Sequence, residues 1–598
     1  GCHLPIQANW KTESHHYEGG ETRNYATYNP QVVRDQMFQL GVHQTTKGNT
    51  IAPVRSSSAL ILSSTNINRE KIYIQQPPIS ASGYSSQAFA PHFPHTVRKT
   101  ETKTCSDCHL SEDKDNNAIM AQLLLQGTNF VNFVGYNAWV GGAGGLEAVR
   151  VTEWDEPQAV IGSYLQKHAY PDWYREHEER VQKLYESYTH GGGEVGCLQL
   201  RGEYLYVAEG RGGFRAYDVA SIANKGVSQR VITAPFSPLG HDTHVSSPDA
   251  TCVALPTNQP IAPSRMNKDE ASFDLMTKDN QEQPIHPLYS YAYVTDRKEG
   301  LIVVNIDTLS DGEPRNNYFE RAVTFNPNGA LTGSRHITVA GTTAYIAGDF
   351  GVAVVSLENP TAPELITTIA IEDARATAAQ FRYLFVTSSQ GLHVVDVTSP
   401  RAPRLVEGAS VELSDARRVY VARTYAYVAA GADGLVIVDI EKPESPRIYE
   451  RFTADGKLTD ASDVVVGSTN ASLFAYVADG KAGLKVIQLT SPDSQPRFYG
   501  FSPEPKPELI AWWPTSWPAK ALSKGLDRDR AVDETGNQIA VFGRLGARPM
   551  TLEESQRLFV NEKGEPWFAG DKVDEDAFDP GTPIHRLPDL PQQDAPSH

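Results

Sequence analysis

The residues with the clearest chemistry are Cys105, Cys108 and His109, which form the segment CSDCH. In a C-x-x-C-H motif the two thiols form thioethers to the vinyl groups of haem, and the adjacent histidine is held beneath the iron as its proximal ligand. A zinc half-site would need two more ligands at a suitable spacing, but the sequence has no second C-x-x-C. A thioredoxin-type pair would need a βαβ context, which is absent. The segment therefore predicts a covalently attached haem c.

The first three residues, Gly1-Cys2-His3, resemble the end of a second such motif whose first cysteine would precede residue 1. A fortuitous Cys-His pair is the alternative. We favour the motif, with His3 as a second iron ligand, because the residues that follow behave like haem-binding sequence. On this interpretation the chain is the C-terminal portion of a longer protein. It would carry at least one haem c, with two or more expected and further haems attached upstream.

The sixth ligand of each iron decides between an electron carrier and an enzyme. A second histidine saturates the iron, whereas an open position admits a substrate. Seven of the 17 histidines lie in the first 125 residues. We favour His95, in the segment PHTV, as an axial ligand; an ordinary surface histidine is the alternative at each position. The further candidates are His92, His43 and the pair His15 and His16.

A repeat follows this region from about residue 126. Seven segments share an alternating aromatic strand, a glycine turn and a second apolar strand, as in YAYVAAGADGLVIVDI. Alternation indicates half-buried strands, and glycine turns indicate antiparallel hairpins. A period of about 40 residues with about four strands is typical of a propeller blade. The aligned aromatic residues and turn glycines are Trp139 and Gly145, Tyr206 and Gly213, Tyr293 and Gly300, Tyr345 and Gly351, Phe385 and Gly391, Tyr427 and Gly434, and Tyr476 and Gly483.

These patterns predict a mainly β protein in three parts. Residues 1–125 would be an irregular, helix-poor c-type haem-binding region, the end of a longer multihaem domain. Residues 126–502 would be a seven-bladed β-propeller, with insertions near 163–190 and 234–288 where the blade pattern is interrupted. Residues 503–598 would be a small α/coil extension that ends in an acidic, proline-rich tail.

Three arginines share one position in consecutive blades. Arg335, Arg375 and Arg417 each lie ten residues before the aligned aromatic residue, where the strand lining the central channel should begin. One interpretation is an arc that binds an anion, a haem propionate or the carboxylates of a partner. The other is a set of surface arginines paired with nearby acids.

The same alignment places Cys197 and Cys252 at equivalent positions in neighbouring blades. They could form a disulfide, but inner strands of neighbouring blades could also lie too far apart for the Cα separation of about 5.5 Å that a disulfide needs. We therefore expect two buried thiols. His241 and His244 in GHDTH have a metal-like spacing, but we expect solvated polar surface there because no further ligand accompanies them.

The composition narrows the range of binding partners to be expected. The formal net charge of −18 argues against nucleic acid, which needs basic patches, and suits a cationic redox partner. We find no run of about 18 apolar residues, so no transmembrane segment is expected. We also find no signal peptide. Redox partner proteins, other haem domains, and a homo-oligomer or larger surface assembly are the partners considered.

The segments GLVIVDIEKPESP and GLHVVDVTSPRAP resemble the LVIVD-repeat β-propeller family over about 125–500. The blades at Leu146, Phe214 and Leu484 depart from the family's core pattern. The first 125 residues are similar to the C-terminal haem region of multihaem c-type cytochromes. The resemblance implies a bacterial protein of the periplasm or cell surface in which the propeller docks or shields a haem chain. The LVIVD family has no settled activity, so it bears on location more than on mechanism.

Three functions follow as expectations. The first is electron transfer through haems, with the propeller as scaffold or docking platform. The second is a multihaem oxidoreductase that acts on a small inorganic nitrogen or sulfur substrate at an open-coordinate haem. The third is a surface binding protein in which the propeller is the functional part.

Overall fold

The structure is a computed structural model. It describes residues 137–153, 159–201, 204–219, 243–256, 286–309, 316–380, 382–469, 472–491 and 502–524, the backbone of six strands within 22–75, and short pieces at 493–494 and within 544–565. The haem motif CSDCH and the segment Gly1-Cys2-His3 lie outside these residues, as do all the other histidines of the first 125 residues except His43. The backbone of His43 falls in one of the six strands.

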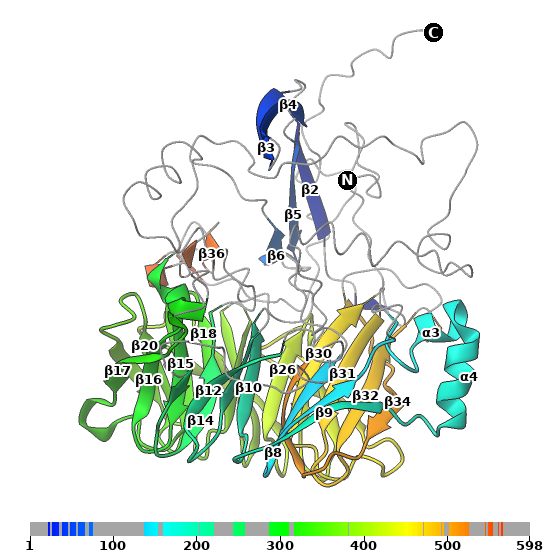
Figure 1. Ribbon diagram of the computed structural model, residues 1–598. Helices are drawn as coiled ribbons and strands as arrows, with labels where there is room; N and C mark the ends of the chain where they lie inside the picture. The colour runs from blue at the N-terminus through cyan, green and yellow to red at the C-terminus, as the bar shows by residue number, and fades with distance from the viewer. Residues whose placement is uncertain are drawn as a thin grey trace.

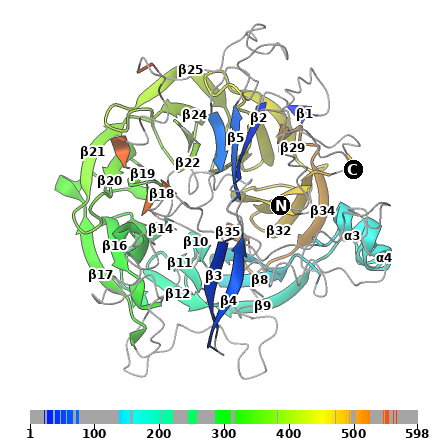
Figure 2. The ribbon, with the colours of Figure 1, turned by 90° about the horizontal axis from the view of Figure 1, so that it is seen from above.

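Seven four-stranded antiparallel sheets surround one axis as the blades of a propeller (Figures 1 and 2). The sequence prediction of a mainly β, seven-bladed propeller with few helices is therefore confirmed. Inner strands of neighbouring blades contact one another around the axis. From the axis outward the blades are: β35 (Ala519–Lys524), β7 (Asn137–Gly142), β8 (Gly145–Arg150), β9 (Tyr185–Gly191); β10 (Cys197–Arg201), β11 (Tyr204–Ala208), β12 (Phe214–Asp218), β13 (His244–Val245); β14 (Ala250–Ala254), β15 (Tyr291–Asp296), β16 (Gly300–Asn305), β17 (Glu320–Phe325); β18 (Ser334–Ala340), β19 (Thr343–Gly348), β20 (Gly351–Ser356), β21 (Glu364–Ile369); β22 (Ala376–Gln380), β23 (Tyr383–Ser388), β24 (Gly391–Asp396), β25 (Arg404–Glu412); β26 (Arg418–Ala422), β27 (Tyr425–Ala429), β28 (Leu435–Asp439), β29 (Arg447–Phe452); β30 (Asp463–Thr469), β31 (Ser472–Ala478), β32 (Leu484–Thr490), β34 (Glu508–Trp513).

The first blade joins the two ends of the propeller. Its innermost strand, β35, comes from the C-terminal side and pairs antiparallel with β7, the first strand of the ring. This arrangement closes the ring without an exposed sheet edge between the first and last blades. β34 and β35 both lie beyond residue 502, so the propeller continues into the segment that the sequence assigned to the C-terminal extension.

Each blade is built around its aligned aromatic residue. All seven lie on the second strand of a blade and are at most 3% exposed. Each turn glycine then opens the third strand with a positive φ, between 73° and 142°. At Gly391 a Cβ would lie 1.9 Å from the carbonyl oxygen of Val411 on the fourth strand. Glycine is therefore required both by the backbone conformation and by the close approach of the neighbouring strand.

The aspartate at the end of the third strand has a structural role, which explains why the repeat places an aspartate after its apolar run. In β28, Asp439 accepts a hydrogen bond from the backbone N–H of Glu441 at 3.0 Å and pairs with Arg447 at 3.0 Å. In β24, Asp396 accepts from the N–H of Thr398 at 2.9 Å and pairs with Arg404 at 3.0 Å. The carboxylate thus stabilises the turn and ties it to the fourth strand.

Two expected insertions are shorter than the sequence indicated. In the first, α3 (Tyr164–Ala169) and α4 (Pro171–Glu179) lie outside the ring, but β9 within the same interval completes the first blade (Figure 2). The second interval, 234–288, contains β13 and β14, which belong to two different blades. Short 3₁₀ turns connect strands at η4 (Pro287–Ser290), η5 (Asp307–Leu309) and η7 (Pro327–Gly329).

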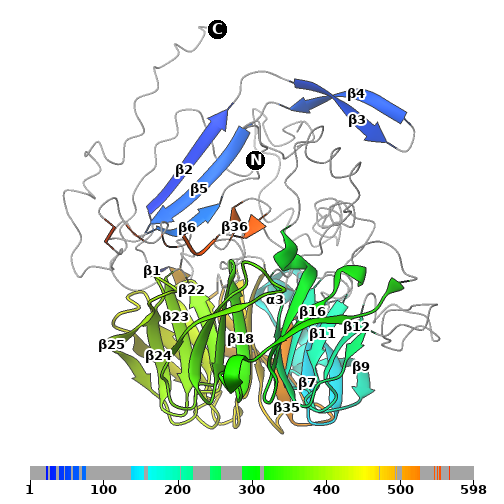
Figure 3. The ribbon, with the colours of Figure 1, turned by 90° about the vertical axis from the view of Figure 1, so that its left-hand side faces the viewer.

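Strands also occur within residues 22–75, where we expected little regular structure. β2, β5 and β6 form one sheet, β3 pairs with β4, and β1 pairs with β33 (Figure 3). In the tail, β36 pairs with β37, and the rest of the expected α/coil extension beyond residue 524 lies mostly outside the described residues. No helix in the described part of the chain is long and apolar enough to cross a membrane. These remaining strands are β1 (Thr22–Arg23), β2 (Thr27–Arg34), β3 (Gln39–Thr45), β4 (Gly48–Arg55), β5 (Ser58–Thr65), β6 (Lys71–Gln75), β33 (Ser502–Pro503), β36 (Arg544–Leu545) and β37 (Arg548–Pro549).

Candidate functional site around the propeller axis

One register position on the seven inner strands carries an unusual set of side chains. In every blade the residue at this position pairs with the residue two places after the aligned aromatic. We call these seven residues the axial ring. In blade order they are Ala521, Cys197, Cys252, His336, Ala376, Arg418 and Asp463.

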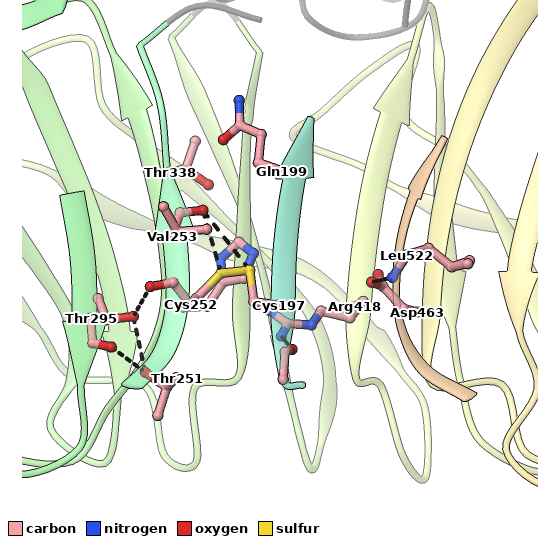
Figure 4. The surroundings of a disulfide bond; sticks show 12 residues. Cys197, Gln199, Thr251, Cys252, Val253, Thr295, Thr338, Arg418, Asp463 and Leu522 are labelled. Carbon is pink, nitrogen blue, oxygen red and sulfur yellow. Dashed lines mark hydrogen bonds between the residues drawn. A yellow bond between two sulfur atoms is a disulfide. The ribbon is translucent and has the colours of Figure 1, made fainter. Parts of the chain in front are cut away.

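Cys197 and Cys252 form a disulfide between the second and third blades, with their Cα atoms 4.7 Å apart (Figure 4). Our expectation of two free thiols is therefore wrong. The inner strands β10 and β14 contact each other closely enough at this level to meet the geometric requirement of the bond. The equivalence of the two positions, inferred from the sequence, is confirmed.

Arg418 spans the axis from the sixth blade to the second. Its Nη2 donates a hydrogen bond at 3.1 Å to the carbonyl oxygen of Gly196, the neighbour of Cys197. Figure 4 shows Arg418 beside the disulfide, and Asp463 beside Leu522. Asp463 accepts from the backbone N–H of Leu522 in the first blade at 2.9 Å. The two side chains therefore link the sixth blade to the second and the seventh blade to the first.

Burial dominates the electrostatics of the axial ring. Burial lowers the pKa of Arg418, and the charge of Asp463 partly offsets this shift. Burial raises the pKa of Asp463, against the opposing effects of Arg418 and two backbone N–H groups. Burial holds the pKa of His336 well below its ordinary value, and the charge of Arg418 acts in the same direction. His336 is therefore neutral at pH 7, and Arg418 and Asp463 compensate each other.

The tautomer of His336 follows from its contacts. Its Nδ1 accepts a hydrogen bond from the backbone N–H of Thr377 in the next blade at 3.2 Å. The proton of the neutral ring therefore lies on Nε2. Thr338 reinforces the same junction, because its hydroxyl donates to the carbonyl oxygen of Thr377 at 2.8 Å. His336 thus joins the fourth and fifth blades.

The three predicted arginines form a continuous chain of ion pairs at the start of the inner strands. Arg335 pairs with Asp349 and Asp373. Arg375 pairs with Asp373 at 2.9 Å and with Asp415 at 2.5 Å. Arg417 pairs with Asp415 and with Asp460, both at 2.7 Å.

Each of these arginines thus lies between two aspartates, and the chain runs from the fourth blade to the seventh. The guanidinium groups are engaged by the protein's own carboxylates, as in the second of our two interpretations. Burial raises the pKa of Asp373 and Asp415, but the hydrogen bonds from the arginines lower it further, so that both stay below their ordinary values. We call this row the Arg–Asp chain.

The sequence did not point to His336, Arg418 or Asp463 as functional residues. The signal was available in part: Cys197, His336 and Arg418 each lie nine residues before their aligned aromatic residue. Asp463 lies thirteen residues before Tyr476, because β30 and β31 are each two residues longer than β26 and β27, so equal spacing does not find it.

The predicted haem ligands other than His43 lie outside the described residues, and of His43 only the backbone is described; these positions therefore stay predictions. Within the described residues no group of three or more His, Cys, Asp and Glu side chains is placed to hold a metal ion. His241 also lies outside the described residues, whereas His244 contacts the carbonyl oxygen of Gly212 through Nε2 at 2.6 Å.

Comparison with known proteins supports the repeat. The profile of the LVIVD repeat matches residues 192–226, 290–311, 333–370, 414–454 and 460–500. No curated protein matches the chain.

The chain is similar to apo AztD from Citrobacter koseri, with 12% identity over 65% of this chain and 97% of that one, at a TM-score of 0.34. It is similar to the extracellular domain of the putative hybrid two component system BT4673 from B. thetaiotaomicron, with 12% identity over 50% of this chain and 34% of that one, at a TM-score of 0.29.

Proposed function

We propose that the chain is an exported c-type cytochrome that transfers electrons, with the propeller as its scaffold and docking platform. The observation that carries this proposal is the segment CSDCH, in which Cys105 and Cys108 would hold the porphyrin and His109 the iron. A bound haem c supplies a reversible one-electron couple at its iron.

The disulfide Cys197–Cys252 supports the location independently of the haem motif. Disulfides persist in oxidising compartments and are rare in the cytosol. Haem c is attached outside the cytoplasm, where such a bond is stable. Both features of the chain therefore favour the periplasm or the cell surface.

The cross-links between blades support the role of the propeller. Closure through β35, the disulfide, the Arg–Asp chain and the contact of Arg418 with Gly196 each tie one blade to another. A ring held in this way offers a rigid surface on which a cofactor-bearing segment or a redox partner can be fixed. The net charge of −18 suits a partner with a cationic docking face.

The axial ligands decide how the haem is used. His95 is our first candidate opposite His109, followed by His92, His43, His15 and His16, and Cys2 with His3 would belong to a second haem. Two histidines at each iron would leave no open position for a substrate. The proposal is therefore a carrier, with donor and acceptor proteins as partners.

Optical and EPR spectra of the purified full-length protein test the proposal. We expect the bands of haem c and a low-spin ferric signal from two axial histidines. A high-spin signal would contradict the carrier and favour an oxidoreductase with an open-coordinate haem. A protein expressed with the haem-attachment machinery yet without haem bands would contradict both and leave the propeller as the functional part. In that case residues 126–524 alone should retain partner binding.

A further inference from the structure

A cavity of about 240 Å³ lies beneath the helical insertion of the first blade. Its lining residues lie mainly at the end of β8, at the start of β9 and on the helix α4, and this helix lies outside the ring of blades (Figures 1 and 2). The haem proposal makes no use of this insertion. Its polar lining residues are Arg150, Glu153, Trp173, Glu176, His177 and Tyr185.

His177 is the most deeply buried of these side chains, at 3% exposure. Its Nε2 donates to the carbonyl oxygen of Ile510 at 2.8 Å. Burial lowers the pKa of His177, so the ring is neutral and Nδ1 carries a lone pair. This Nδ1 is buried and has no hydrogen-bond partner among the described residues. The cavity therefore contains a buried acceptor that lacks a donor.

Gly162 makes the position of His177 possible. A Cβ at this glycine would lie 2.5 Å from the carbonyl oxygen of Ile510 and 2.9 Å from Nε2 of His177. Its φ of +86° also favours glycine. The backbone is thus shaped to hold the imidazole in the cavity wall.

The guanidinium group of Arg150 lines the cavity, and that of Arg180 contacts the ring of the lining residue Tyr185. Arg150 and Arg180 lie over the ring of Tyr185, at 4.2 and 3.4 Å from its centroid. Arg150 Nε and Arg180 Nη1 are buried and lack a hydrogen-bond partner among the described residues. Burial lowers the pKa of Arg180, and the charge of Arg150 acts in the same direction. Two buried donors of like charge are therefore held near each other.

Two carboxylates balance these charges. Glu153 and Glu176 line the cavity, and both act on the charge of Arg180. Glu153 also accepts a hydrogen bond from the side chain of Gln166. The lining thus combines one cation, two anions and one neutral acceptor around a volume below the range of about 300–1,000 Å³ that is usual for drug-sized ligands.

We propose that this cavity binds a free α-amino acid in its zwitterionic form. The carboxylate of the ligand pairs with Arg150, the guanidinium group among the lining residues, because hydrogen bonds between charged groups are the strongest. The ammonium group donates to Nδ1 of His177 and to the carboxylates of Glu153 and Glu176. A neutral sugar fits less well, because both guanidinium groups lie over Tyr185 and Trp173 stacks on Tyr170 at a centroid distance of 4.4 Å.

Isothermal titration of the full-length protein with the common L-amino acids tests this site, with glucose and sodium sulfate as comparison ligands. We expect saturable one-to-one binding of at least one amino acid and none of glucose or sulfate. Arg150→Gln should weaken that binding at least about tenfold. Arg175→Gln is the matched control, because Arg175 lies on α4 with its side chain 64% exposed and pairs only with Asp172 among the contacts of the described residues.

Glu176→Gln, at another charged lining residue, provides a second variant if Arg150→Gln does not fold, as judged by its thermal unfolding. Binding of sulfate alone would overturn the proposal in favour of a simple anion site. Binding of glucose alone would overturn it in favour of a sugar site. Absence of all binding would show that the cavity holds water only. Equal affinity of the wild type and the pocket variants would place the ligand elsewhere.

Discussion

Arg418 Nη2 lies 3.1 Å from the carbonyl oxygen of Gly196 on the opposite side of the propeller axis. Gly196 precedes Cys197, so a charged contact and a disulfide brace the same end of β10 from two directions. This end of β10 therefore connects the second, third and sixth blades.

Replacement of Arg418 should destabilise the ring. Arg418→Met removes the bond to Gly196 and the positive charge that lowers the pKa of Asp463. A hydrogen bond from a charged group contributes about 1.5–3 kcal/mol, and both side chains are half-buried, so we expect a loss of about 1–3 kcal/mol in the free energy of unfolding. Urea denaturation of the propeller transition measures it. In the double variant Arg418→Met, Asp463→Asn part of the loss should be recovered; strictly additive losses would show that the two charges do not interact.

The disulfide Cys197–Cys252 should be detectable by a thiol titration and by the loss of stability that follows its removal. Reduction of the denatured protein should raise the number of titratable thiols by two, from Cys197 and Cys252. The bond closes a loop with a sequence separation of 55 residues, which corresponds to about 4 kcal/mol of loop-closure entropy at 25 °C. The variant Cys197→Ala, Cys252→Ala should therefore unfold at lower urea concentration. An unchanged thiol count after reduction would exclude the bond.

Replacement of a turn glycine by alanine should destabilise the protein most where the neighbouring strand approaches that glycine closely. Gly391→Ala forces a Cβ to within 1.9 Å of the Val411 carbonyl oxygen at a φ of +136°, so we expect a loss of at least about 2 kcal/mol. Gly408→Ala is the matched control, because its φ is +74° and no atom lies within 4 Å of the added Cβ. Only the cost of the conformation, about 1 kcal/mol, should remain there. Equal losses in both variants would show that the close approach has no effect.

His336 should make the propeller sensitive to acid. Its pKa in the folded protein lies well below the ordinary value of 6.5. As the pH falls below about 6.5, the unfolded chain takes up a proton that the folded protein does not, so the free energy of unfolding falls by at most about 1.4 kcal/mol per pH unit from this group. His336→Gln should reduce the pH dependence of the free energy of unfolding between pH 7 and 5. An unchanged slope in His336→Gln would contradict the assignment.

The sequence predicted those parts of the fold that depend on local backbone geometry. The aligned aromatics such as Tyr427 and glycines such as Gly434 repeat because each blade must bury one ring and open one turn. Closure through β35 was not predicted, because the aligned aromatic residue marks only the second strand of each blade, and AKALSK in β35 has no aromatic residue. The pairing of Cys197 with Cys252 was not predicted either, because it depends on the distance between neighbouring blades.

The axial ring was missed for the same reason. Arg418 and Gly196 are 222 residues apart in the sequence, and only closure of the ring brings them together. The Arg–Asp chain was predicted in position, because Arg335, Arg375 and Arg417 begin equivalent strands. Its aspartates come from other turns, so their pairing required the assembled ring.

The haem at CSDCH is the central claim, and mass spectrometry of the digested protein tests it most directly. The peptide that contains Cys105 and Cys108 should carry the added mass of one haem, and the variant Cys105→Ala, Cys108→Ala should lose both this mass and the absorbance contributed by that haem. Recovery of the unmodified peptide, from protein made in a host that attaches haem c, would contradict the account.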